Sequence, residues 1–143
     1  MQQTTSFRKL ITLTSAMLGL LSAEFLLGML SNLYVEFPTT TDQQTLMDAT
    51  WKHWQTASHA ILGILIVLIG LWLVILSIKA KVRSVTVISV LAFLSLVLAA
   101  VGGDRFVRTQ HNVWSLTMAV GFIVAMGLYG RLLALVQSAT NGS

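Results

Sequence analysis

Three ionisable side chains lie in or beside apolar stretches of this chain and could carry chemistry. Glu24 lies within the apolar stretch 10–33, about ten residues or roughly 15 Å along a helix from its end. His59 lies just inside the stretch 57–78, and His111 lies at the threshold of the stretch 113–136. A carboxyl group in apolar surroundings can bind a proton or a ligand, and an imidazole can bind a proton or a metal.

No Lys or Arg stands at the depth of Glu24 in another apolar stretch. We therefore expect Glu24 to be protonated, paired with a histidine, or hydrogen-bonded to Ser, Tyr or water. Two interpretations stay open. One is a proton or ligand site, and the other is a protonated carboxyl group that bridges two helices.

The two histidines suggest a haem site. On a helix, Gly63, Ile66 and Gly70 follow on the face of His59 and make it low and smooth, suited to a neighbouring helix or a flat ligand. Diagonal helices of a bundle lie roughly 12–14 Å apart, a gap that two histidines bound to one haem iron can span. The alternative is that both histidines bond loop carbonyls or lipid headgroups.

The haem hypothesis assigns roles to further residues. His59 and His111 would be axial ligands of haem b, Gly63 would make room for the ring, and Glu24 would tune it or relay protons. Arg105 or Arg108 would hold a haem propionate or a lipid phosphate. His53 is interpreted as a loop residue, and whether it joins a site stays open.

Four apolar stretches must position these residues: Leu10–Leu33, Ala57–Ile78, Ser84–Val101 and Val113–Val136. Each is close to the length of about 20 residues that a helix needs to cross a bilayer, and each must satisfy its own backbone polar groups there. The chain of 143 residues is 55% hydrophobic and 10% charged, which leaves no room for a soluble catalytic domain. The sequence predicts one all-α transmembrane domain over residues 1–143.

Composition excludes several chemistries. The absence of Cys excludes disulfides, thiol catalysis and iron–sulfur ligation. The net charge of +4 comes without a run of basic residues, so we predict no nucleic-acid partner. Six of the nine Lys and Arg fall on the side of the termini if the helices alternate, which predicts a multi-pass protein of the cytoplasmic membrane with both termini in the cytoplasm.

Short connections predict an up-and-down four-helix bundle in which the second and fourth helices are diagonal. Small residues should form the helix contacts. They are Ser15, Gly19 and Ala23; Gly63 and Gly70; Ala92, Ser95 and Ala99; Gly121 and Ala125. Gly102 and Gly103 should end the third helix, and Asp104 and Arg105 should form a turn with a local charge pair.

The outer loop 34–56 is predicted to contain a short interfacial helix. Asp42 could cap a helix over Gln43–Gln55. This helix would carry Leu46, Met47, Trp51 and Trp54 toward the membrane, where Trp commonly anchors at the interface.

Parts of the sequence resemble two kinds of known membrane protein. The segments 26–35, 58–63 (Ser-His-Ala-Ile-Leu-Gly) and 114–121 resemble small, mostly uncharacterised four-helix membrane proteins of Gram-positive bacteria. The places of His59 and His111 resemble the haem-ligating histidines of one half of haem A synthase, and 59–63 is similar to that family's His-Arg-x-Leu-Gly element. Ala60 replaces the Arg, and Thr56 stands where the family's Glu-x-x-His motif has Glu. The resemblance implies haem binding without haem A synthesis.

The sequence thus predicts a small membrane protein that binds haem b, or is associated with redox chemistry, through a bis-histidine site near the outer surface. Quinone is a predicted electron-transfer partner. The alternatives are a non-enzymatic accessory subunit of a larger membrane complex and a small transporter that uses Glu24. A homo-oligomer would supply the internal repeat that transporters usually have. Enzymatic activity stays open, because no strong catalytic motif is present.

Overall fold

Four long helices and one short helix form the protein. A computed structural model describes residues 2–36, 38 and 42–141. The helices are α1 (Gln2–Tyr34), α2 (Gln43–Lys52), α3 (Trp54–Lys79), α4 (Arg83–Thr109) and α5 (Asn112–Asn141). All except α2 are long and apolar enough to cross a membrane. The prediction of four apolar helices that could span a bilayer is therefore confirmed.

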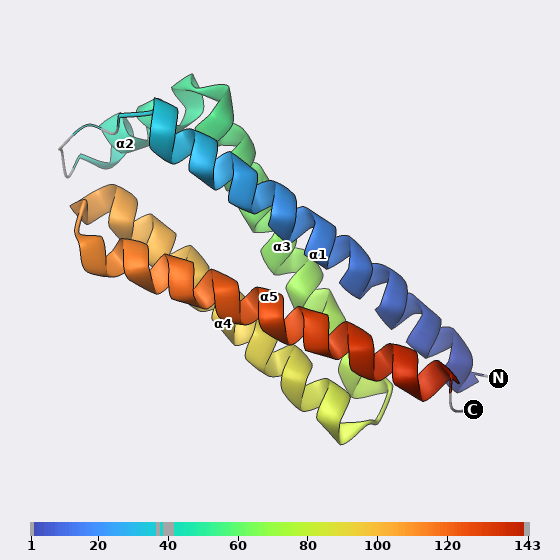
Figure 1. The fold of residues 1–143 in the computed structure, drawn as a ribbon. Coiled ribbons are helices and arrows are strands. Elements are labelled where there is room, and N and C mark those ends of the chain that lie inside the picture. The colour runs from blue at the N-terminus through green and yellow to red at the C-terminus, as the bar shows by residue number, and fades with distance from the viewer. Residues whose placement is uncertain (1, 37, 39–41, 142–143) are drawn as a thin grey trace.

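The long helices pack as an antiparallel bundle. Helix α1 packs against α3 and α5, and α4 packs against the same two helices, so α3 and α5 are diagonal as predicted. Figure 1 shows the two chain ends at one end of the bundle and α2 at the other. These are named below the terminal end and the α2 end.

The core runs along the bundle axis on residues three or four apart. On α1 the fully buried side chains are Leu10, Thr14, Met17 and Leu21. This alternation of three and four residues keeps one helix face on its neighbours. The other helices contribute apolar side chains to the same cluster, namely Ile66, Leu73, Ala80, Val85, Ala92, Leu96, Ala125, Tyr129, Leu132 and Val136.

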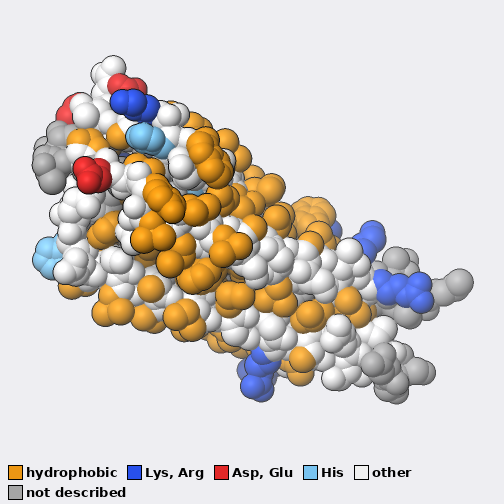
Figure 2. Space-filling model, turned by 45° about the horizontal axis from the view of Figure 1, so that its top comes forward, with side chains coloured by type: hydrophobic (Ala, Val, Ile, Leu, Met, Phe, Trp, Pro, Cys, Tyr) orange, Lys and Arg blue, Asp and Glu red, His pale blue; other side chains and the backbone are white. Residues whose placement is uncertain are grey.

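The outer surface of the bundle is apolar as well. Large hydrophobic side chains such as Leu26, Ile64, Leu68 and Ile123 are more than half exposed. Figure 2 shows hydrophobic side chains over the middle of the visible face and charged side chains mainly toward the two ends. Because exposed apolar area of this extent is unfavourable in water, the surface fits a lipid bilayer.

Each long helix continues beyond its apolar stretch, and α4 does so mainly at its C-terminal end. It runs eight residues past Val101, to Thr109, where Gln110 adopts a left-handed conformation (φ 53°) and donates its N–H to the Phe106 carbonyl. The prediction that Gly102 and Gly103 end this helix is wrong. A Cβ at Gly102 would lie 2.7 Å from the Met118 backbone nitrogen, so this glycine, inside α4, allows the backbones of α4 and α5 to approach closely.

Small residues form the predicted contact between α4 and α5, but the small residues of α1 do not form the contact predicted for them. Ala92, Ala99, Gly121 and Ala125 are buried as expected. The stripe of Ser15, Gly19 and Ala23 on α1, in contrast, is exposed, and a Cβ at Gly19 would meet nothing within 4 Å. That prediction is wrong, because larger residues on the opposite face of α1 fill the core instead.

The short helix α2 begins where predicted and ends earlier. The Asp42 carboxylate accepts the Thr45 backbone N–H at 2.9 Å, which confirms the predicted N-cap. The helix ends at Lys52, and the Thr56 hydroxyl donates to the backbone carbonyls of Thr50 and His53 at the break before α3. Residues 37 and 39–41 of the predicted outer loop lie outside the described residues.

Candidate functional site: a glutamate–histidine pair between α1 and α3

Glu24 and His59 contact each other across the seam between α1 and α3. The Glu24 Oε1 atom lies 2.9 Å from His59 Nδ1, with 11% of the Glu24 side chain and 35% of the His59 side chain exposed. Of the three environments expected for Glu24, the structure selects pairing with a histidine. Among the described residues, His59 is the one basic side chain within ion-pair distance of Glu24.

Two glycines make room for this pair. Gly28 follows Glu24 by one turn of α1, and Gly63 follows His59 by one turn of α3. A Cβ at Gly28 would lie 3.2 Å from His59 Cε1, and a Cβ at Gly63 would lie 3.0 Å from Glu24 Oε1. Each ionisable side chain therefore packs against a glycine of the opposite helix.

The antiparallel arrangement of α1 and α3 explains this reciprocal contact. Residues four apart lie on one face of a helix. When two such faces meet head to tail, Glu24 comes opposite Gly63 and Gly28 comes opposite His59. Sequence reasoning identified Gly63 but missed Gly28. The spacing of four residues between Glu24 and Gly28, the same as between His59 and Gly63, was the available signal.

Two polar atoms of the Glu24–His59 pair make no hydrogen bond among the described residues. Among the described residues, Glu24 Oε2 is buried and has no hydrogen-bond partner. The contact of Oε1 with His59 Nδ1 meets the distance of an ion pair without the alignment of a hydrogen bond. A buried polar atom without a partner is costly, so a proton, a water molecule or a ligand is expected at Oε2.

The pair lies above a closed apolar core. On α1, Met17 and Leu21 fill the next two turns toward the terminal end, and on α3 the buried Ile66 and Leu73 lie about two and four turns beyond His59. Beside the pair, the rings of Phe25 and Phe122 stack with centroids 6.0 Å apart and hold α5 against α1. His59 is the more exposed member of the pair, with 35% of its side chain exposed against 11% for Glu24.

His111 is not part of this pair. It lies in the connection between α4 and α5 and is exposed, and its Nδ1 accepts the Val113 N–H at 3.5 Å. Phe122 and Ala125, farther along α5, pack inside the bundle, but the imidazole of His111 lies at the α2 end. The structure thus brings Glu24, His59 and Gly63 together and shows no contact of His111 with them.

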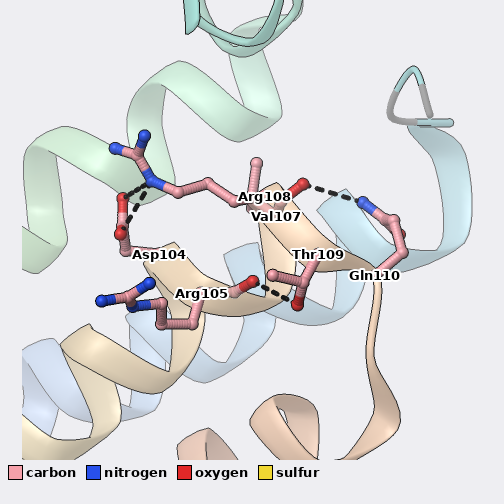
Figure 3. Close-up of polar contacts among 6 residues, drawn as sticks. All are labelled: Asp104, Arg105, Val107, Arg108, Thr109 and Gln110. Atoms are coloured by element: carbon pink, nitrogen blue, oxygen red, sulfur yellow. Dashed lines mark hydrogen bonds and ion pairs between the residues drawn. The ribbon is translucent and has the colours of Figure 1, made fainter. Parts of the chain in front are cut away.

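Arg105 also lies apart from the pair. Its side chain is exposed near the end of α4, and its carbonyl accepts the Thr109 hydroxyl. The predicted local pair of Asp104 with Arg105 is wrong. Asp104 pairs with Arg108 at 2.9 Å, because the helix continues and places these two residues one turn apart (Figure 3).

Metal ligands do not converge in the described part of the chain. No group of three or more His, Asp or Glu residues is placed to hold a metal ion there. A haem iron would need only two histidine ligands. In this structure His59 contacts Glu24, and His111 is exposed in the connection between α4 and α5.

Comparison with family models, with curated proteins and with solved structures finds no match for this chain. The architecture is consistent with a small four-helix membrane protein, and no family is identified.

Proposed function

We propose that this protein is a multi-pass membrane protein whose Glu24–His59 pair binds and releases a proton from the α2 side. The observation that carries the proposal is the 2.9 Å contact between a buried carboxyl group and a partly exposed imidazole inside an apolar bundle. Ionisable residues within membrane helices are costly and commonly serve proton transfer or ligand binding. Glu24 is the proton-binding group, and His59 is the connection to the surface.

The direction of access follows from the surroundings of the pair. Toward the terminal end, Met17, Leu21 and Leu73 are buried, and the buried polar side chains among the described residues there are the hydroxyl-bearing Thr14, Ser77 and Ser89. His59 packs against Gly28 and so lies one helical turn nearer the α2 end than Glu24, with 35% of its side chain exposed. In this proposal a proton reaches Glu24 through His59.

The distribution of basic residues supports an orientation for this access. The Lys and Arg of the termini and of the connection between α3 and α4, together with Arg131, outnumber those of the α2 end by six to three. Because cytoplasmic segments carry the excess of Lys and Arg, the α2 end is proposed to face away from the cytoplasm across the cytoplasmic membrane. Proton exchange then occurs with the outer side.

Infrared titration of the protein in lipid nanodiscs tests the proposal. Lowering the pH should produce carbonyl bands from all five Asp and Glu side chains, and the component that Glu24→Gln removes from the difference spectrum is the band of Glu24. His59→Asn should shift the pH at which this component develops, whereas the control His53→Asn, in the break between α2 and α3, should not shift it. The proposal would be contradicted if Glu24→Gln removed no component, or if both histidine variants gave equal shifts.

Haem b is a second candidate function, favoured by the orientation of His59. Metal-binding histidines commonly present one ring nitrogen to a carboxylate and bind the metal with the other. Glu24 occupies the Nδ1 side of His59, which leaves Nε2 as the ligand. Haem would supply electron transfer when bound. Glu24 would fix the tautomer of the His59 imidazole, and His111 is the proposed second ligand of the haem iron.

An absorption spectrum tests this second candidate. Purified protein, oxidised and then reduced with dithionite, should show a Soret band and sharp reduced α and β bands if it binds low-spin haem. His59→Ala and His111→Ala should each abolish these bands, and His53→Ala should not. Protein that stays colourless after addition of haem would end the haem hypothesis and leave the proton site in place.

A further inference from the structure

A second polar feature lies at the α2 end, apart from the Glu24–His59 pair. A cavity of about 130 Å³ separates α2 from the end of α4. Its apolar walls are Leu46, Met47 and Trp51 of α2 and Val107 of α4, and Arg108 and Asp104 stand among its polar lining residues. The volume equals that of roughly four water molecules, so the cavity admits a short apolar segment with a polar group attached.

The Arg108 guanidinium is held in place by its neighbour. Its Nε donates to both oxygens of Asp104, at 3.0 and 2.9 Å. Figure 3 shows the two terminal nitrogens of Arg108 pointing away from Asp104. Within the described residues, these two nitrogens have no partner. A guanidinium with two free, parallel amino groups matches the oxygens of a phosphate.

The position of the cavity limits what can occupy it. It lies where the transmembrane helix α4 ends beside α2, whose Trp51 and Met47 are more than half exposed. Trp side chains gather at the level of lipid headgroups. At that level, one molecule with an apolar chain directly below a negatively charged group is abundant, and it is a phospholipid.

We propose that the cavity between α2 and α4 is a phospholipid site. The phosphate binds the terminal nitrogens of Arg108, and the upper part of one acyl chain lies against Leu46, Trp51 and Val107. Asp104 positions the guanidinium and takes no part in lipid contact through its carboxylate. The site is independent of the Glu24–His59 pair and of the function proposed for it.

Native mass spectrometry of the detergent-purified chain tests the site, with phosphatidylglycerol as the probe. The unaltered protein should bind one lipid more tightly than any further lipid. Arg108→Gln should weaken this first binding about tenfold, because charge-assisted hydrogen bonds to the phosphate are lost. Arg105→Gln is the matched control, since it removes the same charge from α4 at a residue that does not line the cavity, and it should leave the affinity within about twofold.

A second variant tests the apolar part of the site. Val107→Trp should fill the cavity and weaken the first lipid while Arg108 stays in place, and circular dichroism should show unchanged helix content in all variants. Equal weakening by the two arginine variants would overturn the proposal, because the effect would then be one of net charge. Unchanged binding in Val107→Trp would overturn it too. The proposal would also be overturned if inorganic phosphate bound through Arg108 while phosphatidylglycerol did not bind.

Discussion

The two helix pairs of this bundle use glycine in different ways. In the α4–α5 pair, a Cβ at Gly102 would lie 2.7 Å from the Met118 nitrogen, and a Cβ at Gly121 would lie 2.9 Å from the Ala99 nitrogen. In the α1–α3 pair, the glycines meet the side chains of His59 and Glu24 instead. The first pair brings two backbones together, and the second leaves space for ionisable groups.

This difference distinguishes the α4–α5 contact, which serves packing, from the α1–α3 contact, which contains the candidate site. Small residues between membrane helices usually serve close packing, and the α4–α5 pair follows that rule. A glycine that faces a carboxylate or an imidazole gains little packing, because the polar group itself occupies the space. The type of atom that a glycine meets is therefore the observation that distinguishes Gly28 and Gly63 from Gly102 and Gly121.

The largest expected effect comes from breaking the backbone contact. Gly102→Leu should destabilise the protein by about 1–3 kcal/mol, since the added side chain must push α4 and α5 apart. Reversible unfolding in mixed micelles measures the free energy. Gly127→Leu is the control, because a Cβ at Gly127 would meet nothing within 4 Å, so the better helix propensity of Leu should leave the stability unchanged or raise it by up to about 1 kcal/mol. Equal losses in both variants would show that the close backbone contact at Gly102 has no special role.

A smaller effect on stability, but a clear one on proton binding, is expected from Gly63→Ala and Gly28→Ala. The new methyl groups need shifts of a few tenths of an ångström in the flexible ends of Glu24 and His59. The strain is offset by the better helix propensity of Ala, about 1 kcal/mol, so stability should change little. The pH at which the Glu24 carboxyl band develops in the infrared titration should change.

Gly19→Ala provides the control for these two variants. Gly19 lies on α1 with open space around it, so the same substitution should leave the titration of Glu24 unaltered. If Gly19→Ala shifted the titration as much as Gly63→Ala, the contact of Gly63 with the carboxylate would have no special role.

The smallest effect is expected at an exposed carboxylate, Asp42, which contrasts with the buried Glu24. Hydrogen bonds from the Thr45 hydroxyl and then the Thr45 backbone N–H lower the pKa of Asp42 below its usual 3.8. Because the folded pKa lies below the unfolded one, the cap stabilises α2 above pH 4 and is lost as the pH falls through the folded pKa. The protection factor of the Thr45 amide, which corrects its exchange rate for the intrinsic effect of pH, should fall below that pH, and Asp42→Asn should remove most of this pH dependence.

Sequence reasoning succeeded where a pattern is local. Apolar length predicted the four spanning helices, and the Asp42 cap followed from its place before Gln43–Gln55. The prediction that α4 ends at Gly102 was wrong, because glycine commonly ends helices in water but also lets membrane helices approach closely. Sequence reasoning failed at Ser15, Gly19 and Ala23 as well, since helical spacing identifies a face of α1 without saying which neighbour, if any, that face meets.

The amino-acid sequence by itself determined that this chain forms long apolar helices with Glu24 in one of them and His59 near the start of another. Length and hydrophobicity suffice for that, because a backbone in lipid must satisfy its own hydrogen bonds. Only the tertiary structure decided that Glu24 pairs with His59 and that His111 stays outside the pair. That outcome depends on the register of α1 against α3, which is set by packing between residues far apart in the sequence. The matching spacings of Glu24–Gly28 and His59–Gly63 are compatible with this register but do not by themselves establish it.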